Sequence, residues 1–136
     1  MIHHPIPPIY NEKSKILILG SFPSVKSRDI EFFYGHPQNR FWRVIAAIFE
    51  SPTPQTIDEK REMLLANGVA IWDVIGSCEI TGSSDSSIRD VVPNDLGEIF
   101  AVADIKQIFV NGKTAASVQD RLNDLRLFTS YPILLL

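Results

Sequence analysis

The sequence has only one cysteine, Cys78, among its 136 residues. A single thiol cannot form an internal disulfide, and it cannot supply the four thiolates of an iron–sulfur cluster or of a cysteine-rich zinc site. No apolar run reaches the ~20 residues that cross a bilayer, and the first residues lack the apolar segment of a secretory signal. These absences predict a reduced, cytoplasmic protein without membrane contact.

A large excess of one charge is also missing. The formal net charge is −3, which by itself argues against nucleic-acid binding. Residues 1–45, however, contain six basic and three acidic side chains, a net charge of +3, and residues 46–136 carry a net charge of −6. A basic segment on an acidic body is compatible with a local phosphate-binding face. A chance fluctuation of three charges explains the pattern equally well, so charge alone does not decide.

What the sequence does contain is enough for one folded unit. Hydrophobic residues make up 45% of the chain and charged residues 21%, which is ordinary for a globular protein. The length is that of one typical domain. We therefore expect residues 1–136 to form a single domain with one core.

Short apolar runs that end in glycine alternate with helical patterns along the chain. The runs predict strands buried on both faces, and they comprise residues 15–20, 68–76 and 106–112. Capping residues and apolar spacing predict helices, which begin at or after Asn39, Thr56, Asn94 and Thr114. A fourth strand is predicted within residues 125–136. The first dozen residues resemble an extended arm, and residues 21–38 a long loop.

Strands that alternate with helices predict a parallel α/β sheet. Ligands bind to such sheets beyond the carboxyl ends of the strands. The three predicted strands are followed there by polar segments that contain glycine, at residues 20–24, 76–87 and 111–114. The pattern thus predicts where a ligand binds, but not which ligand.

The segment between residues 31 and 49 is the most unusual part of the chain. Three consecutive aromatic residues precede Gly35, and such rings either stack on a flat ligand or anchor the loop in the core. Asn39 and Arg40 follow in the predicted first helical turn, where free backbone N–H groups favour anions. The alternatives are that Asn39 caps its own helix and that Arg40 pairs with a surface carboxylate.

Several motifs together resemble one known family. They read GSFPS at residues 20–24, FFYGHPQNRFW at 32–42, GVAIWDVIGSCEITGSSDSSI at 68–88 and FVNGKTA at 109–115. In this order they resemble the uracil-DNA glycosylase superfamily, and most of all its hypoxanthine-DNA (deoxyinosine) glycosylase branch. The HPQNRFW segment is also similar to mismatch-specific uracil-DNA glycosylases. The resemblance extends from Lys15 to Ala116.

This resemblance implies a three-layer α/β/α sandwich with a short, mostly parallel four-stranded sheet. It implies a monofunctional enzyme of base-excision repair that flips a deaminated base out of DNA and hydrolyses its N-glycosidic bond. Hypoxanthine is the first expected base, with uracil and xanthine as further ones. No metal or cofactor is implied, and the expected partner is single-stranded or duplex DNA bound by a monomer. We expect a prokaryotic, cytoplasmic protein associated with the nucleoid.

Site residues carry over where the motifs match. Phe22 occupies the position at which the superfamily normally has a water-positioning Asp or Asn, so Asn39 is implied as the catalytic residue. The implied base-binding residues are Gly20, Ser21, Phe22, Pro23, Tyr34, Gly35, His36 and Asn111. The implied DNA-binding residues are Ser24, Lys26, Ser27, Arg40, Ser84, Asp85, Ser86 and Lys113.

Two acidic residues remain open. Asp85 could stabilise a positively charged sugar or hold a water, or it could simply cap the start of a helix in a solvated loop. Asp73 lies within a predicted strand and needs a partner if it is buried.

The last motif of the superfamily, a loop that enters the DNA minor groove, has no clear match. Ser130, Tyr131 and Pro132 are only faintly similar to it. We therefore expect a domain truncated at its C-terminus, with weakened action on duplex DNA. One alternative is an activity like that of the mismatch-specific uracil-DNA glycosylases. Two rival hypotheses are a catalytically impaired remnant that still binds DNA or a base, and a small-molecule nucleotide-binding domain. The sequence has neither a P-loop nor a G-x-G-x-x-G turn after the first predicted strand, which argues against the nucleotide-binding domain.

Overall fold

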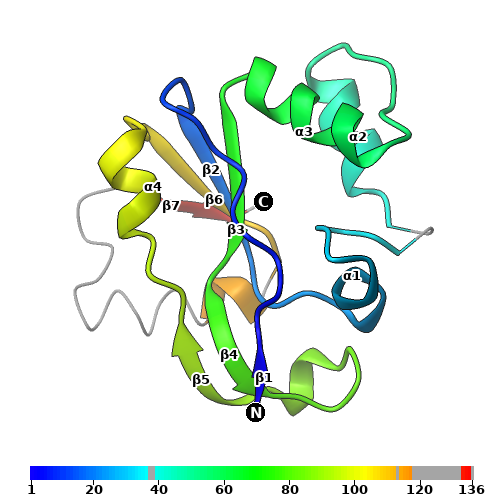
Figure 1. Cartoon of the computed structure of the whole chain (residues 1–136), viewed down its shortest axis with the longest axis vertical. Helices are drawn as coiled ribbons and strands as arrows, with labels where there is room; N and C mark the ends of the chain where they lie inside the picture. The colour runs from blue at the N-terminus through cyan, green and yellow to red at the C-terminus, as the bar shows by residue number, and fades with distance from the viewer. Residues whose placement is uncertain (37–38, 113, 118–132, 136) are drawn as a thin grey trace.

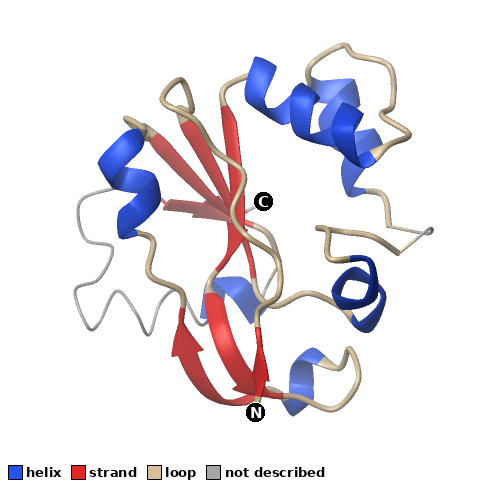
Figure 2. Cartoon of the chain, viewed as in Figure 1, coloured by secondary structure: helices blue, strands red, loops and turns tan. Residues whose placement is uncertain are grey.

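A parallel sheet forms the centre of the protein. The computed structural model describes residues 1–36, 39–112, 114–117 and 133–135 (Figures 1 and 2). The sheet has the strand order β3-β2-β6-β7 and all neighbours are parallel. Its strands are β2 (Ile16–Gly20), β3 (Val69–Asp73), β6 (Gln107–Val110) and β7 (Ile133–Leu135). All five residues of β3 are buried, as expected for a strand covered on both faces.

Helices lie on both sides of this sheet. Figure 1 shows α1 (Val25–Ile30), α2 (Phe41–Ile48) and α3 (Ile57–Ala66) on one side and α4 (Gly97–Val102) on the other. This is the arrangement that right-handed crossovers give when the chain runs from β2 to β3 and then from β3 back past β2 to β6. The α/β class predicted from the alternating pattern is therefore observed.

The helix predicted to begin at or after Thr56 is α3, and Thr56 is its N-cap. The Thr56 hydroxyl accepts a hydrogen bond from the backbone N–H of Glu59 at 3.1 Å. In α2, four residues on one face are buried: Phe41, Trp42, Ile45 and Ala46. The predicted long loop before α2 is partly wrong, because Ser24 caps the short helix α1 within it.

The predicted strand at residues 68–76 is in fact two strands. It breaks at Val74, and β4 (Ile75–Glu79) leaves the parallel sheet to pair with β1 (Ile2–His3) and β5 (Arg89–Pro93) in a second, antiparallel sheet. Asn94 stabilises the break, since its side-chain Nδ2 donates to the carbonyls of Asp73 and Ile75 at 2.9 and 3.1 Å. Asn94 is thus not the cap of α4, which begins after Leu96.

The N-terminal arm is integrated into the fold. Besides β1, it contributes Ile9, which bridges to Ile71 of β3, the edge strand of the parallel sheet, and both Ile6 and Ile9 are buried. After Thr114, residues 114–117 are helical; the remainder of that predicted helix, the start of the predicted fourth strand and Ser130–Pro132 lie outside the described residues. Among the described residues, no helix is long and apolar enough to cross a membrane.

Candidate functional site

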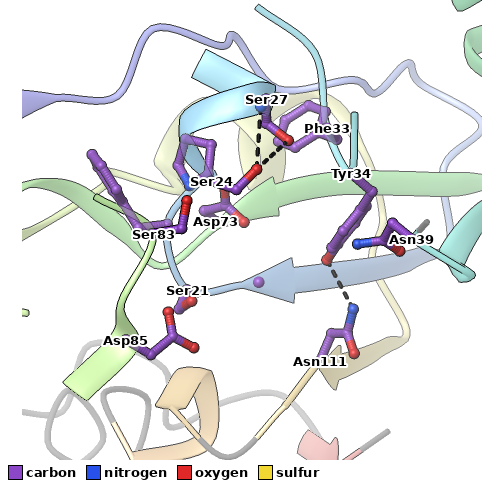
Figure 3. Close-up of a pocket in the computed structure, with 13 residues that line it drawn as sticks. Ser21, Ser24, Ser27, Phe33, Tyr34, Asn39, Asp73, Ser83, Asp85 and Asn111 are labelled. Carbon is purple, nitrogen blue, oxygen red and sulfur yellow. Dashed lines mark hydrogen bonds between the residues drawn. The ribbon is translucent and has the colours of Figure 1, made fainter. Parts of the chain in front are cut away.

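A cavity of about 220 Å³ opens beyond the carboxyl ends of β2, β3 and β6 (Figure 3). Parallel strands bring these ends to one edge of the sheet, which is where the sequence predicted a ligand site. The cavity is smaller than sites for drug-sized ligands, which start at roughly 300 Å³, and it suits a ligand of one or two rings. It is lined by Gly20, Ser21, Phe22, Pro23, Ser24, Ser27, Phe33, Tyr34, Asn39, Asp73, Ser83, Asp85 and Asn111.

The N-terminus of α1 joins two polar loops at the cavity. Ser24 caps this helix, and its hydroxyl donates to the Ser27 hydroxyl at 3.2 Å. The backbone N–H of Val25 donates to the Ser83 hydroxyl at 2.8 Å, which fixes the second polar loop against the first. Ser27 is 2% exposed and accepts a hydrogen bond from the N–H of Gly35 at 2.9 Å. Its burial argues against the phosphate contact implied for it.

Tyr34 forms one wall of the cavity. Its ring stacks on Phe41 with centroids 3.9 Å apart, and its hydroxyl accepts a hydrogen bond from Asn111 Nδ2 at 2.9 Å. Asn111 follows β6, so this bond connects the aromatic loop to the end of the central sheet. Burial and, secondarily, the negative charge of Asp73 raise the pKa of Tyr34 far above its ordinary value. The phenol is therefore a neutral hydrogen-bonding group.

This raised pKa predicts a pH-dependent loss of stability. In the unfolded chain Tyr34 ionises near about pH 10, whereas in the folded protein it stays neutral. Its contribution to stability is full below that pH and falls as the pH rises toward the native pKa. We expect Tyr34→Phe to lose less unfolding free energy than the wild type above about pH 10. Denaturant unfolding across this range measures the difference, and parallel curves for the two proteins would contradict it.

The Asn39 side chain both bonds to the start of α2 and lines the cavity. Its Oδ1 accepts a hydrogen bond from the backbone N–H of Phe41, the first residue of α2, at 2.8 Å. The N-cap itself is Arg40, so Asn39 is not the cap that the alternative reading of the sequence predicted. The amide Nδ2 has no hydrogen-bond partner among the described residues. Because Oδ1 is held, the side chain has a fixed orientation, and its N–H donors remain available to a ligand.

Asp73 has the partner that its burial requires. Asp73 Oδ2 lies 2.7 Å from His4 Nε2, and the two side chains are 6% and 2% exposed. The sequence prediction missed His4, which was assigned to an extended arm. The unpaired acidic residue within an apolar strand was the available signal, but the partner lies 69 positions away in the sequence.

Several of the predicted residues do not line the cavity. The six that the structure describes are Gly35, His36, Lys26, Arg40, Ser84 and Ser86. Lys26, Arg40, Ser84 and Ser86 are exposed and adjoin cavity-lining residues in the sequence. Gly35 packs so closely on Ile30 that a side chain there would clash. Lys113 lies outside the described residues. Asp85 is exposed and lines the cavity. Within the described ranges no cluster of three metal-ligating side chains occurs.

Comparisons with known proteins agree with this geometry. A model of the uracil DNA glycosylase superfamily matches residues 7–133. The chain is 35% identical over 124 residues to a hypoxanthine DNA glycosylase of Methanosarcina acetivorans, covering 90% of this chain and 78% of the relative. It is 32% identical over 115 residues to a protein of the same name from Methanosarcina barkeri, covering 83% and 73%.

A solved structure is similar over the whole chain. It is a solution NMR structure of a proposed uracil DNA glycosylase from Methanosarcina acetivorans, with a TM-score of 0.82 and 30% identity. The similarity covers 100% of this chain and 83% of that one. The match of the family model and the agreement of sequence and fold place the chain in the uracil DNA glycosylase superfamily.

Proposed function

We propose that the protein is a monofunctional DNA glycosylase that removes deaminated bases, hypoxanthine first, in base-excision repair. The observation that supports this most is the cavity itself, in which the free amide donor of Asn39 and the wall formed by Tyr34 meet at the end of the sheet. Its volume suits one flipped base. The relatives named hypoxanthine DNA glycosylase support the choice of the first substrate.

Bond cleavage requires stabilisation of the departing base. The base leaves with the electron pair of the C1′–N bond, and an oxocarbenium-like sugar remains. Asn39 Nδ2 donates a hydrogen bond to the charge that develops on the base. Water then adds to C1′ and loses a proton, which balances the proton that the base takes up. No covalent bond to the protein forms in these reaction steps.

Water placement uses the other atom of the same amide. Asn39 Oδ1 accepts one hydrogen bond from Phe41, and its second lone pair can accept one from the attacking water. An amide is too weak a base to remove the proton, so its contribution is orientation. The exposed Asp85 at the edge of the cavity supplies negative charge for the cationic sugar.

DNA contacts extend around the mouth of the cavity. Lys26 lies between the cavity-lining residues Ser24 and Ser27, and Arg40 follows Asn39. Both are exposed basic residues and are suited to contact phosphate groups. The Ser84 and Ser86 hydroxyls lie 3.0 Å apart on the exposed second loop, where they can contact the backbone. The protein would act as a monomer on nucleoid DNA in a prokaryotic cytoplasm.

A single-turnover base-release assay tests the proposed function. With enzyme in excess, we expect free hypoxanthine to appear from oligonucleotides that contain 2′-deoxyinosine. Release should be faster from single strands than from duplexes, because no base pair has to be broken and less stacking is lost on flipping. Oligonucleotides with uracil or xanthine in the same position rank the substrates.

The same assay separates the rival function. Salt-dependent DNA binding without release of any base, at enzyme excess and long incubation, would contradict the glycosylase proposal and favour the impaired DNA-binding remnant. An oligonucleotide with adenine at the test position is the matched control, from which no base should be released.

A further inference from the structure

Tyr34 has a backbone conformation that a large side chain seldom adopts. Its φ angle is 50°, in the left-handed region that few residues other than glycine, asparagine and aspartate enter. A residue stays in such a conformation only when the surrounding structure imposes it, and such residues cluster at functional sites. The cavity wall formed by the Tyr34 ring therefore depends on the groups that fix the two peptide units on either side of its Cα atom.

Both of these peptide units are held by side chains from neighbouring helices. On the N-terminal side, the Phe33 carbonyl accepts a hydrogen bond from Trp42 Nε1 at 3.2 Å. On the C-terminal side, the Gly35 N–H donates to Ser27 Oγ at 2.9 Å. Trp42 lies in α2 and Ser27 in α1. Their residues are 5% and 2% exposed, and hydrogen bonds in such surroundings are stronger than in water.

Ser27 makes the more extensive contacts of the two. Its carbonyl accepts the N–H of Phe32 at 3.1 Å, so its backbone fixes one end of the aromatic segment 32–35 and its hydroxyl fixes the other. The hydroxyl is positioned in turn by Ser24, whose Oγ accepts the Ser27 N–H and donates to Ser27 Oγ, both at 3.2 Å (Figure 3). The cap of α1 and the Tyr34 backbone thus belong to one chain of hydrogen bonds.

We propose that Ser27 is a positioning residue, which keeps Tyr34 in the left-handed conformation and so forms the cavity wall before any base arrives. The inference rests on the proposed glycosylase function. Without the Ser27 acceptor, the peptide unit between Tyr34 and Gly35 can turn, and φ of Tyr34 returns to the negative values that L-residues prefer. The ring then leaves Phe41, on which it stacks, and Asn111, which donates to its hydroxyl. Ser27 thereby acts on the base only through Tyr34.

The wild-type protein without DNA gives the first test, by NMR. At a left-handed φ the HN and Hα atoms of a residue are closer together than at negative φ, so Tyr34 should give a strong intraresidue NOE between them. The Gly35 amide should exchange slowly with solvent deuterium, because its hydrogen bond to Ser27 is part of the packed structure. A weak NOE, or a Gly35 amide that exchanges as fast as an unfolded chain, would overturn the proposal.

The variant Ser27→Ala removes the acceptor and keeps a small side chain. We expect the Tyr34 NOE to weaken and single-turnover release from 2′-deoxyinosine to fall roughly 10- to 100-fold, because a displacement of about 1 Å in a reactive site can cost 100-fold in rate. Binding of an oligonucleotide with adenine at the test position should not change, since the Ser27 hydroxyl is buried. An unchanged NOE or release rate, or a loss of release that only follows a loss of DNA binding, would overturn the positioning role.

Ser14→Ala is the matched control. Ser14 is fully buried, and its Oγ accepts a backbone N–H, that of Asn11, at 3.0 Å. It precedes β2 and so lies at the opposite end of the strands from the cavity. This variant should lose a similar amount of stability in denaturant unfolding but keep the wild-type Tyr34 NOE and release rate. If both variants lost activity in proportion to stability, the effect of Ser27 would be structural and the proposal would be wrong.

The two kinds of readout separate this proposal from the function on which it rests. A protein that shows the Tyr34 NOE and the protected Gly35 amide, loses both in Ser27→Ala and yet releases no base would contradict the glycosylase function alone. Base release by the wild type that Ser27→Ala leaves unchanged would contradict the positioning role of Ser27 alone.

Discussion

Replacing Asn39 by alanine should lower the single-turnover rate of hypoxanthine release by about 10²–10³-fold. This is the usual cost of removing one preorganised donor aimed at developing negative charge. Here the donor is the Asn39 amide Nδ2, which has no partner among the described residues and whose orientation is fixed because Oδ1 accepts the N–H of Phe41 at 2.8 Å. The assay with enzyme in excess, on an inosine-containing single strand, measures the effect on chemistry apart from product release.

The double role of Asn39 requires a control that separates catalysis from support of the helix start. Alanine also removes the hydrogen bond to the N–H of Phe41, which costs about 1 kcal/mol of stability. Asn39→Ser retains an oxygen that can accept the N–H of Phe41 but lacks the amide donor. We expect Asn39→Ser to be as inactive as Asn39→Ala and nearly as stable as the wild type. Activity that follows stability across the two variants would show that Asn39 only supports the start of α2.

Local signals explain how much of the fold was predictable. The apolar runs at β2, β3 and β6 and the Thr56 cap each lie within about ten consecutive residues. Such patterns report burial and hydrogen bonding between near neighbours. Because parallel strands end at one edge, they also located the cavity, and with the family motifs they identified Asn39 and Tyr34 as lining residues.

Contacts between distant segments explain what was missed. The apolar run at residues 68–76 gives no sign of a break, which depends on Asn94 bonding to the carbonyls on either side of Val74. His4 likewise gains its role only through Asp73, 69 residues later. In both cases one polar side chain satisfies groups far away in the chain, and periodicity contains no information about such pairs.

The substitution Gly20→Ala should abolish activity through a single added methyl group. Gly20 is the last residue of β2 and lies opposite Asp73 in the register of the two strands. A Cβ there would overlap with Asp73 Oδ1 and lie 3.0 Å from the Tyr34 hydroxyl. The carboxylate cannot move away freely, because His4 holds its other oxygen at 2.7 Å. The methyl group must therefore displace Asp73, Tyr34 or the strand itself.

Each of these displacements damages the site more than the fold. Overpacking of this kind costs roughly 1–3 kcal/mol of unfolding free energy, whereas a shift of about 1 Å in a catalytic site can cost roughly 100-fold in rate. Gly97→Ala is the matched control, since its Cβ would meet only the exposed side chain of Asp95 in a helix that favours alanine. If Gly20→Ala released hypoxanthine at the wild-type rate, the base would not approach the edge of the sheet between Asp73 and Tyr34. Loss of release in a variant that still unfolds cooperatively, with Gly97→Ala fully active, would locate the base beside Gly20.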